Sequence, residues 1–284
     1  MSVAFTRNSD IEIAYETFGR PGGRPLLLIQ GGLAPMEGWH EDFCASLVER
    51  GFHVARFDNR DAGRSSRAAT RYTLADMATD GSAVLDALGW AGAHVAGVSL
   101  GGMIAQTMAT RHADRVLSLT SLSSAPDHLM RWERRKISAL VKFAAAHRKK
   151  PADPHAAGTQ MVRVFRIVGS TGYPHDEDWI RDLGRRIHEH RTDLAAFRRQ
   201  AAAVFASGDR RAELSRVRVP ALVITGEADP LQTVRAGRAT ADAIPGARFV
   251  TYPGMGHDLP RELWPAVIDE IHAIATASTG GTRI

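Results

Sequence analysis

The chain has 284 residues, of which 44% are hydrophobic and 24% are charged, and its formal net charge is +5. This composition is that of an ordinary globular protein with a sizeable hydrophobic interior, and it excludes a disordered or fibrous chain. No nucleic-acid motif accompanies the positive charge, so we expect no nucleic-acid partner. A single cysteine, Cys44, excludes an internal disulfide.

The sequence shows neither a signal peptide nor a membrane-spanning segment. Residues 1–7 lack the apolar core of a signal peptide, and no run approaches the roughly 18 apolar residues of a membrane span. We therefore expect a cytoplasmic protein without a membrane partner.

The predicted strands and helices alternate over most of the chain. Residues 11–16 alternate apolar and polar side chains, as a half-exposed strand does, whereas residues 26–29 are continuously apolar, as a strand covered on both faces is. Further strands are predicted at residues 52–57, 93–98, 116–120, 221–225 and 248–252. Helical periodicity predicts helices at residues 41–50, 74–88, 100–112, 233–244 and 261–275. This order predicts an α/β fold, with a mostly parallel twisted sheet, an antiparallel edge and helices on both faces.

The alternation stops between about residues 125 and 211, where several helical segments follow one another without a buried strand. We therefore predict a core made of residues 1–124 and 212–284, and an inserted helical cap made of residues 125–211. Three large apolar residues of this segment, Met130, Trp132 and Phe165, are candidates for a substrate pocket. The alternative is that such residues only pack the inserted helices together.

The sequence Gly97-Val98-Ser99-Leu100-Gly101 lies between a predicted strand and a predicted helix. A Gly-x-Ser-x-Gly in that position is typical of a nucleophile elbow, a tight turn that exposes the serine above the sheet. Ser99 is therefore the candidate nucleophile.

A serine hydroxyl needs a base to take its proton and a carboxylate to orient that base. The strand at residues 221–225 is followed by Glu227 and Asp229, of which we favour Asp229 and keep Glu227 as the alternative. The strand at residues 248–252 is followed by a glycine-rich loop that ends in His257, the candidate base. The chain order serine, acid, histidine is the order of hydrolases that carry a nucleophile elbow.

A tetrahedral intermediate also needs backbone N–H donors for its oxyanion. One donor should be Leu100, at the positive N-terminus of the helix that follows Ser99. The other should be Gly32, in the loop after the strand at residues 26–29, although two glycines there could also form a plain turn. The same loop supplies two further candidates for the substrate pocket, Leu33 and Trp39.

With these motifs, the chain resembles the α/β-hydrolase superfamily over nearly its whole length. The family usually has a histidine before the glycine of the oxyanion loop, where this chain has Gln30, and a glycine where this chain has Asp61 in Asp58-Asn59-Arg60-Asp61-Ala62-Gly63-Arg64-Ser65. This variant loop, with Gly31-Gly32 and Pro253-Gly254-Met255-Gly256-His257, is particularly similar to the aclacinomycin methylesterase-like carboxylesterases. The resemblance implies a serine hydrolase whose substrate is a methyl ester of a polyketide-like or other hydrophobic small molecule.

The residues and the resemblance together predict a serine hydrolase, free of metals and other cofactors, that cleaves a small-molecule carboxylic ester through an acyl-enzyme. The serine at the elbow argues against haloalkane dehalogenases and epoxide hydrolases, which use aspartate there. The alternatives are a lyase, a decarboxylase or a carbon–carbon bond hydrolase with the same triad, and a non-catalytic receptor for a small molecule. The sequence leaves open whether the chain forms a homodimer.

Overall fold

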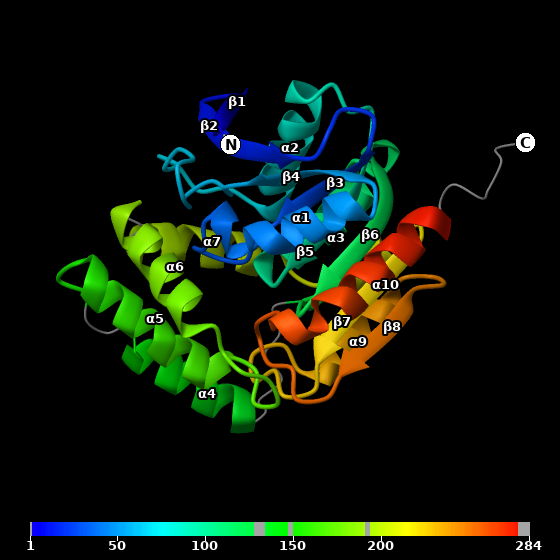
Figure 1. Cartoon of the computed structure of the whole chain (residues 1–284). Helices are drawn as coiled ribbons and strands as arrows, with labels where there is room; N and C mark the ends of the chain where they lie inside the picture. Colours follow the sequence, from blue (N-terminus) through cyan, green and yellow to red (C-terminus); the bar gives the residue numbers. More distant parts are fainter. Residues whose placement is uncertain (1, 128–133, 147–149, 191–193, 278–284) are drawn as a thin grey trace, which may run out of the picture.

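Eight strands form one sheet in the order β1-β2-β4-β3-β5-β6-β7-β8 (Figure 1). The computed structural model describes residues 2–127, 134–146, 150–190 and 194–277. The strands are β1 (Ala4–Asn8), β2 (Ile11–Phe18), β3 (Arg24–Ile29), β4 (Phe52–Phe57), β5 (Ala93–Val98), β6 (Val116–Leu122), β7 (Ala221–Gly226) and β8 (Arg248–Tyr252). Strand β2 is antiparallel to β1 and to β4, and the other neighbours are parallel. The predicted α/β fold with an antiparallel edge is confirmed.

Helices cover both faces of the sheet. They are α1 (Glu41–Glu49), α2 (Leu74–Ala87), α3 (Leu100–Arg111), α4 (Arg134–Ala146), α5 (Pro154–Val168), α6 (Glu177–Glu189), α7 (Leu194–Ser207), α8 (Arg211–Leu214), α9 (Val234–Ala243) and α10 (Trp264–Ala277). Buried residues of α2 and α3 form one core cluster with Leu27 and Ile29 of β3, and buried residues of α1 and α10 form another with Leu26 and Leu28. Because successive side chains of a strand point to opposite faces, the continuously apolar β3 supplies both cores.

Strand β1 was missed by the sequence analysis. It is five residues long, and none of its residues is fully buried. Its pairing with β2 places it at the edge of the sheet. A short edge strand buries too little apolar surface to leave a clear pattern in the sequence.

Helices α4–α7 follow one another between β6 and β7, where the sequence analysis expected an insertion. Arginine side chains link this segment to the rest of the chain. Arg199 of α7 donates two hydrogen bonds to the Asp61 carboxylate, with N–O distances of 2.7 and 2.8 Å. Arg67 donates to the backbone carbonyl of His190, at the end of α6, over 2.6 Å. Within the described residues, every helix is too short or too polar to cross a lipid bilayer.

A buried ion pair fixes the loop that follows β4. Arg60 donates to both carboxylate oxygens of Asp80 on α2, over 2.6 and 2.7 Å, and Asn8 of β1 donates to the same carboxylate over 2.8 Å. Arg60 and Asp80 are 7% and 1% exposed, so water cannot replace either partner without local opening. The pair thereby joins the loop, α2 and the edge strand.

Replacing Asp80 with alanine should lower the free energy of unfolding by about 3–5 kcal/mol, because it leaves the Arg60 guanidinium buried and unpaired. The matched control is Asp76→Ala, one turn earlier on α2. Asp76 is exposed and completes the capping box with Thr73, so its loss should cost about 1 kcal/mol. Urea unfolding of both variants measures the two losses of unfolding free energy. Equal losses would contradict the role of the Arg60–Asp80 ion pair in holding the loop.

Candidate active site

Ser99 occupies a strained turn between β5 and α3. Its backbone angles are φ 55° and ψ −117°, a conformation that costs a non-glycine residue on the order of 1–3 kcal/mol. A Cβ atom at Gly97 would clash with the backbone of Gly101, and one at Gly101 would clash with the carbonyl of Ile29. The two glycines therefore permit the close packing of α3 on the sheet.

The structure brings Ser99, His257 and Asp229 into one hydrogen-bonded chain. His257 Nε2 lies 3.0 Å from Ser99 Oγ, and His257 Nδ1 lies 2.8 Å from Asp229 Oδ2. The Asp229 side chain is fully buried and the His257 side chain is 13% exposed. Asp229 Oδ1 accepts hydrogen bonds from the amides of Leu231 and Gln232, both over 2.8 Å. These donors hold the carboxylate in the orientation in which it faces the histidine.

Glu227, the alternative acid, lies elsewhere. Its carboxylate accepts a hydrogen bond from Thr251 Oγ1 over 2.8 Å, and its side chain is exposed. The turn at the end of β7 packs closely on the histidine loop, since a Cβ atom at Gly226 would clash with the backbone of Met255. Beyond this turn, Asp229 faces His257, whereas Glu227 faces Thr251.

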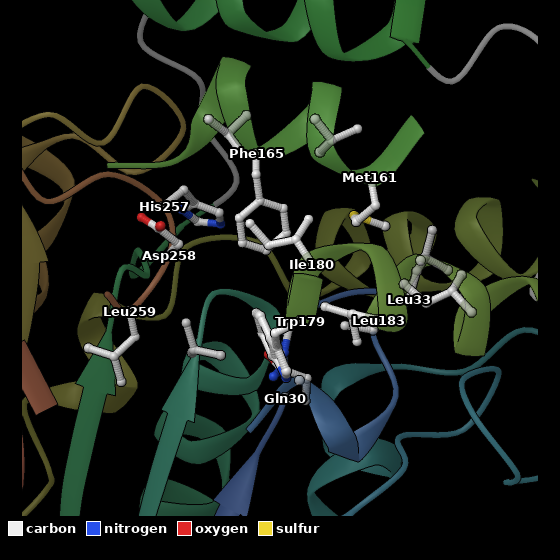
Figure 2. Close-up of a pocket in the computed structure, with 18 of the residues that line it drawn as sticks. Gln30, Leu33, Met161, Phe165, Trp179, Ile180, Leu183, His257, Asp258 and Leu259 are labelled. Atoms are coloured by element: carbon white, nitrogen blue, oxygen red, sulfur yellow. The ribbon is translucent and has the colours of Figure 1, made fainter. Parts of the chain in front are cut away.

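One inserted helix reaches the histidine. The amide of His257 donates a hydrogen bond over 2.7 Å to the carbonyl of Val168, the last residue of α5. The next residue, Asp258, accepts a hydrogen bond from Ser170 Oγ over 2.6 Å. Burial raises the pKa of the Asp258 carboxyl. The sequence analysis missed Asp258, which lines the cavity beside His257 (Figure 2).

The two residues predicted to supply the oxyanion donors, Gly32 and Leu100, lie against each other. A Cβ atom at Gly32 would be 3.7 Å from Leu100 Cδ2, which puts the loop after β3 against the start of α3. On either side of Gly32 the amides are used: Gly31 donates to Gln30 Oε1 over 2.6 Å, and Leu33 donates to Gln200 Oε1 over 2.9 Å. Among the described residues, the Gly32 and Leu100 amides have no hydrogen-bond acceptor.

The two departures from the family's motifs have clear structural roles. Gln30 accepts the Gly31 amide through its side chain, and its carbonyl accepts Asn59 Nδ2 over 2.8 Å. Asp61 has φ 69°, in the region that favours glycine, and its buried carboxylate accepts hydrogen bonds from Tyr72 and Arg199. The side chain at residue 61 thus ties the loop after β4 to inserted helix α7.

A large apolar cavity opens beside Ser99 and His257. Its volume is about 2050 Å³, and its lining combines the loop after β3 with helices α5 and α6. Leu33, Trp39 and Phe165, three of the predicted pocket residues, belong to this lining. Figure 2 shows Phe165 and Met161 of α5 pointing toward Ile180 and Leu183 of α6. The other two predicted pocket residues, Met130 and Trp132, lie outside the described residues.

An aromatic pair, Phe165 of α5 and Trp179 of α6, covers part of this cavity. The two rings meet edge to face with their centroids 6.2 Å apart. Trp179 was not among the predicted pocket residues, although its helix has a strongly amphipathic pattern that could have marked its apolar face.

The described residues contain no cluster of three or more histidine, cysteine, aspartate or glutamate side chains that could hold a metal ion. The single cysteine, Cys44, is buried in α1, and burial raises the pKa of its thiol to about 12. Its thiol is therefore protonated at neutral pH.

The chain is similar to known proteins over nearly its whole length. Residues 24–260 match the alpha/beta hydrolase fold family. The chain is 32% identical to rhodomycin D methylesterase DauP of Streptomyces sp. (strain C5) and to rhodomycin D methylesterase DnrP of Streptomyces peucetius, each over 98% of this chain and 100% of the relative. The crystal structure of the enol-lactonase from Burkholderia xenovorans LB400 superimposes with a TM-score of 0.77 at 25% identity, covering 96% of this chain and 100% of that chain. The chain therefore belongs to the α/β-hydrolase family, and its relatives include methylesterases of the kind that the sequence motifs indicated.

Proposed function

We propose that this protein is a serine hydrolase that needs no cofactor and cleaves a carboxylic ester of a hydrophobic small molecule through an acyl-enzyme. The observation that carries the proposal is the hydrogen-bonded chain from Ser99 through His257 to Asp229, in which Ser99 and His257 line an apolar cavity. This arrangement activates a hydroxyl for attack, because the histidine contacts the serine and a buried carboxylate accepts the other ring N–H of the histidine.

In the first half of the reaction, Ser99 Oγ attacks the ester carbonyl carbon while His257 Nε2 takes the hydroxyl proton. Asp229 accepts the Nδ1–H of His257, which keeps the imidazole in the required tautomer and stabilises its charged form. The carbonyl oxygen becomes an oxyanion, which the amides of Gly32 and Leu100 stabilise. The intermediate then collapses, the carbon–oxygen bond to the leaving alcohol breaks, and His257 returns the proton to that alcohol.

In the second half, a water molecule attacks the acyl carbon and gives its proton to His257. The same two amides stabilise the second oxyanion. Collapse breaks the bond to Ser99 Oγ, which regains its proton from His257, and the carboxylic acid product leaves. Atoms balance as ester plus water to acid plus alcohol.

The cavity and the relatives together support a substrate class. The lining is mainly aliphatic and aromatic, and a volume of about 2050 Å³ accommodates a polycyclic acyl group. Two relatives that are 32% identical over nearly the full length are rhodomycin D methylesterases. We therefore propose a methyl ester of a polyketide-like or similarly hydrophobic molecule as substrate. The deciding experiment compares methyl esters, lactones, amides and p-nitrophenyl esters with the wild type and Ser99→Ala.

Ser99→Ala should fold normally and lose hydrolysis by a factor on the order of 10⁴ or more, because the variant keeps the cavity but has no nucleophile. His257→Ala should lose a similar factor across neutral pH. Initial rates on a p-nitrophenyl ester measure the loss, and stoichiometric labelling by a fluorophosphonate should occur in the wild type only. Activity of Ser99→Ala within tenfold of the wild type would contradict the proposal, and labelling without turnover would favour a receptor.

Asp229→Asn should lower kcat by about 10⁴-fold, because an amide favours the wrong histidine tautomer and does not stabilise the imidazolium. Glu227→Gln is the matched control, since it makes the same chemical change two residues earlier on a side chain that contacts Thr251. It should stay within a few-fold of the wild type. The opposite ranking would assign the acid to Glu227.

We also propose that residues 125–211 act as a cap that sets substrate choice. Phe165→Ala and Trp179→Ala remove the two aromatic rings that meet over the cavity, so the ranking among esters of different acyl size should change by about tenfold or more. Fluorophosphonate labelling of Ser99 should continue at a similar rate in both variants. Unchanged ranking across the ester panel would make the segment a structural appendage.

A further inference from the structure

An inserted helix contacts the loop that is expected to bind the oxyanion. Gln200 of α7 is 3% exposed and lies next to Gly32, since a Cβ atom at Gly32 would be 3.4 Å from Gln200 Oε1. We infer that Gln200 is a positioning residue for the oxyanion hole, which it keeps in shape through the backbone of Leu33. This inference rests on the function proposed above.

In the loop after β3, the amides on either side of Gly32 are held by different side chains. Gly31 is held by the side chain of its neighbour Gln30, over 2.6 Å, and Leu33 is held by Gln200, over 2.9 Å. Leu33 also has φ 62°, a conformation that a leucine rarely adopts without outside support. With both neighbours held, the peptide of Gly32 has little freedom to rotate, and its amide stays available for the substrate oxygen.

Gln200 is itself held from two directions. Its Nε2 donates a hydrogen bond over 3.1 Å to the carbonyl of Arg60, whose side chain forms the buried ion pair with Asp80. The preceding residue, Arg199, makes two charge-assisted hydrogen bonds to the fully buried carboxylate of Asp61. Because both residues anchor α7 on the loop after β4, the position of Gln200 is set by the core as well as by its own helix.

Two general considerations make this contact matter for catalysis. Oxyanion donors work because they point at the developing charge before the reaction begins, and displacement of a reacting group by about 1 Å can cost about 10²-fold in rate. Without Gln200, the Leu33 amide loses a buried acceptor, which gives the loop a reason to rearrange toward another one. The inserted helices would therefore influence the chemical step besides covering the substrate.

The test uses Gln200→Leu and Gln200→Met, which remove the acceptor of the Leu33 amide. Gln160→Leu is the matched control, because Gln160 also lines the cavity from an inserted helix but donates to the carbonyl of Ala146. Two inhibitors separate the states of the reaction. A trifluoromethyl ketone forms a hemiketal oxyanion on Ser99, whereas the methyl ketone with the same carbon skeleton serves as a ground-state analogue.

Gln200→Leu and Gln200→Met should lower kcat/KM by about 10- to 100-fold and weaken trifluoromethyl ketone inhibition by a similar factor. Methyl ketone binding should change less than threefold. Gln160→Leu should affect both ketones equally. Thermal unfolding of each variant verifies that the fold is retained.

Three results would overturn the inference: unchanged kcat/KM in Gln200→Leu, equal weakening of both ketones, or loss of folding in both the Leu and Met variants. The last result would assign Gln200 to general stability. Ser99→Ala, assayed beside them, tells the two proposals apart. If Ser99→Ala is inert and Gln200→Leu is fully active, only the positioning role fails; if Ser99→Ala stays active, the proposed function fails together with the inference.

Discussion

The close approach of α3 to strands β3 and β5 constrains everything else in the candidate site. Gly97 and Gly101 meet backbone atoms at positions where a Cβ atom would clash, so no side-chain movement could relieve a larger residue. Ser99 adopts a positive φ between them, and Leu100 lies against Gly32 in the loop after β3. The strain of this turn is offset by α3, because its residues from Leu100 to Ala109 are all buried.

The loops around this turn form one hydrogen-bonded system in which Gln30 and Asp61 both take part. Gln30 receives the Gly31 amide and, through its carbonyl, the side chain of Asn59. Asp61 has a positive φ, and its buried carboxylate pairs with Arg199. Gln30 and Asp61, which differ from the family's usual residues, therefore change the hydrogen-bond partners of their loops, and both loops are still held by hydrogen bonds. The connection made by Asp61 runs to helix α7.

Helices α5 and α7 also form hydrogen bonds to the loops of the site. The carbonyl of Val168 holds the amide of His257, and the side chain of Gln200 holds the amide of Leu33. Both bonds reach loops of the core from segments between β6 and β7. Under the proposed function, a substitution that reshapes these helices to accept another acyl group would thus also act on the loops that carry His257 and the candidate oxyanion donors. Under the proposed function, a change in substrate range would therefore also change the reaction rate.

The sequence by itself determined the sheet, the turn at Ser99 and the strand ends that carry Asp229 and His257, because these depend on local signals: apolar runs, glycines at fixed spacing and the common edge at which parallel strands end. It did not determine β1, whose five residues bury little apolar surface, nor the roles of Gln200, Asp258 and Trp179. Gln200 and Leu33 are separated by 167 positions, and Asp258 and Ser170 by 88. Helical periodicity shows which face of α7 is buried but not which backbone amide that face will meet. Only the packing of the inserted helices on the core decided those partners, because a buried hydrogen bond is specified by the relative placement of two elements and not by either element alone.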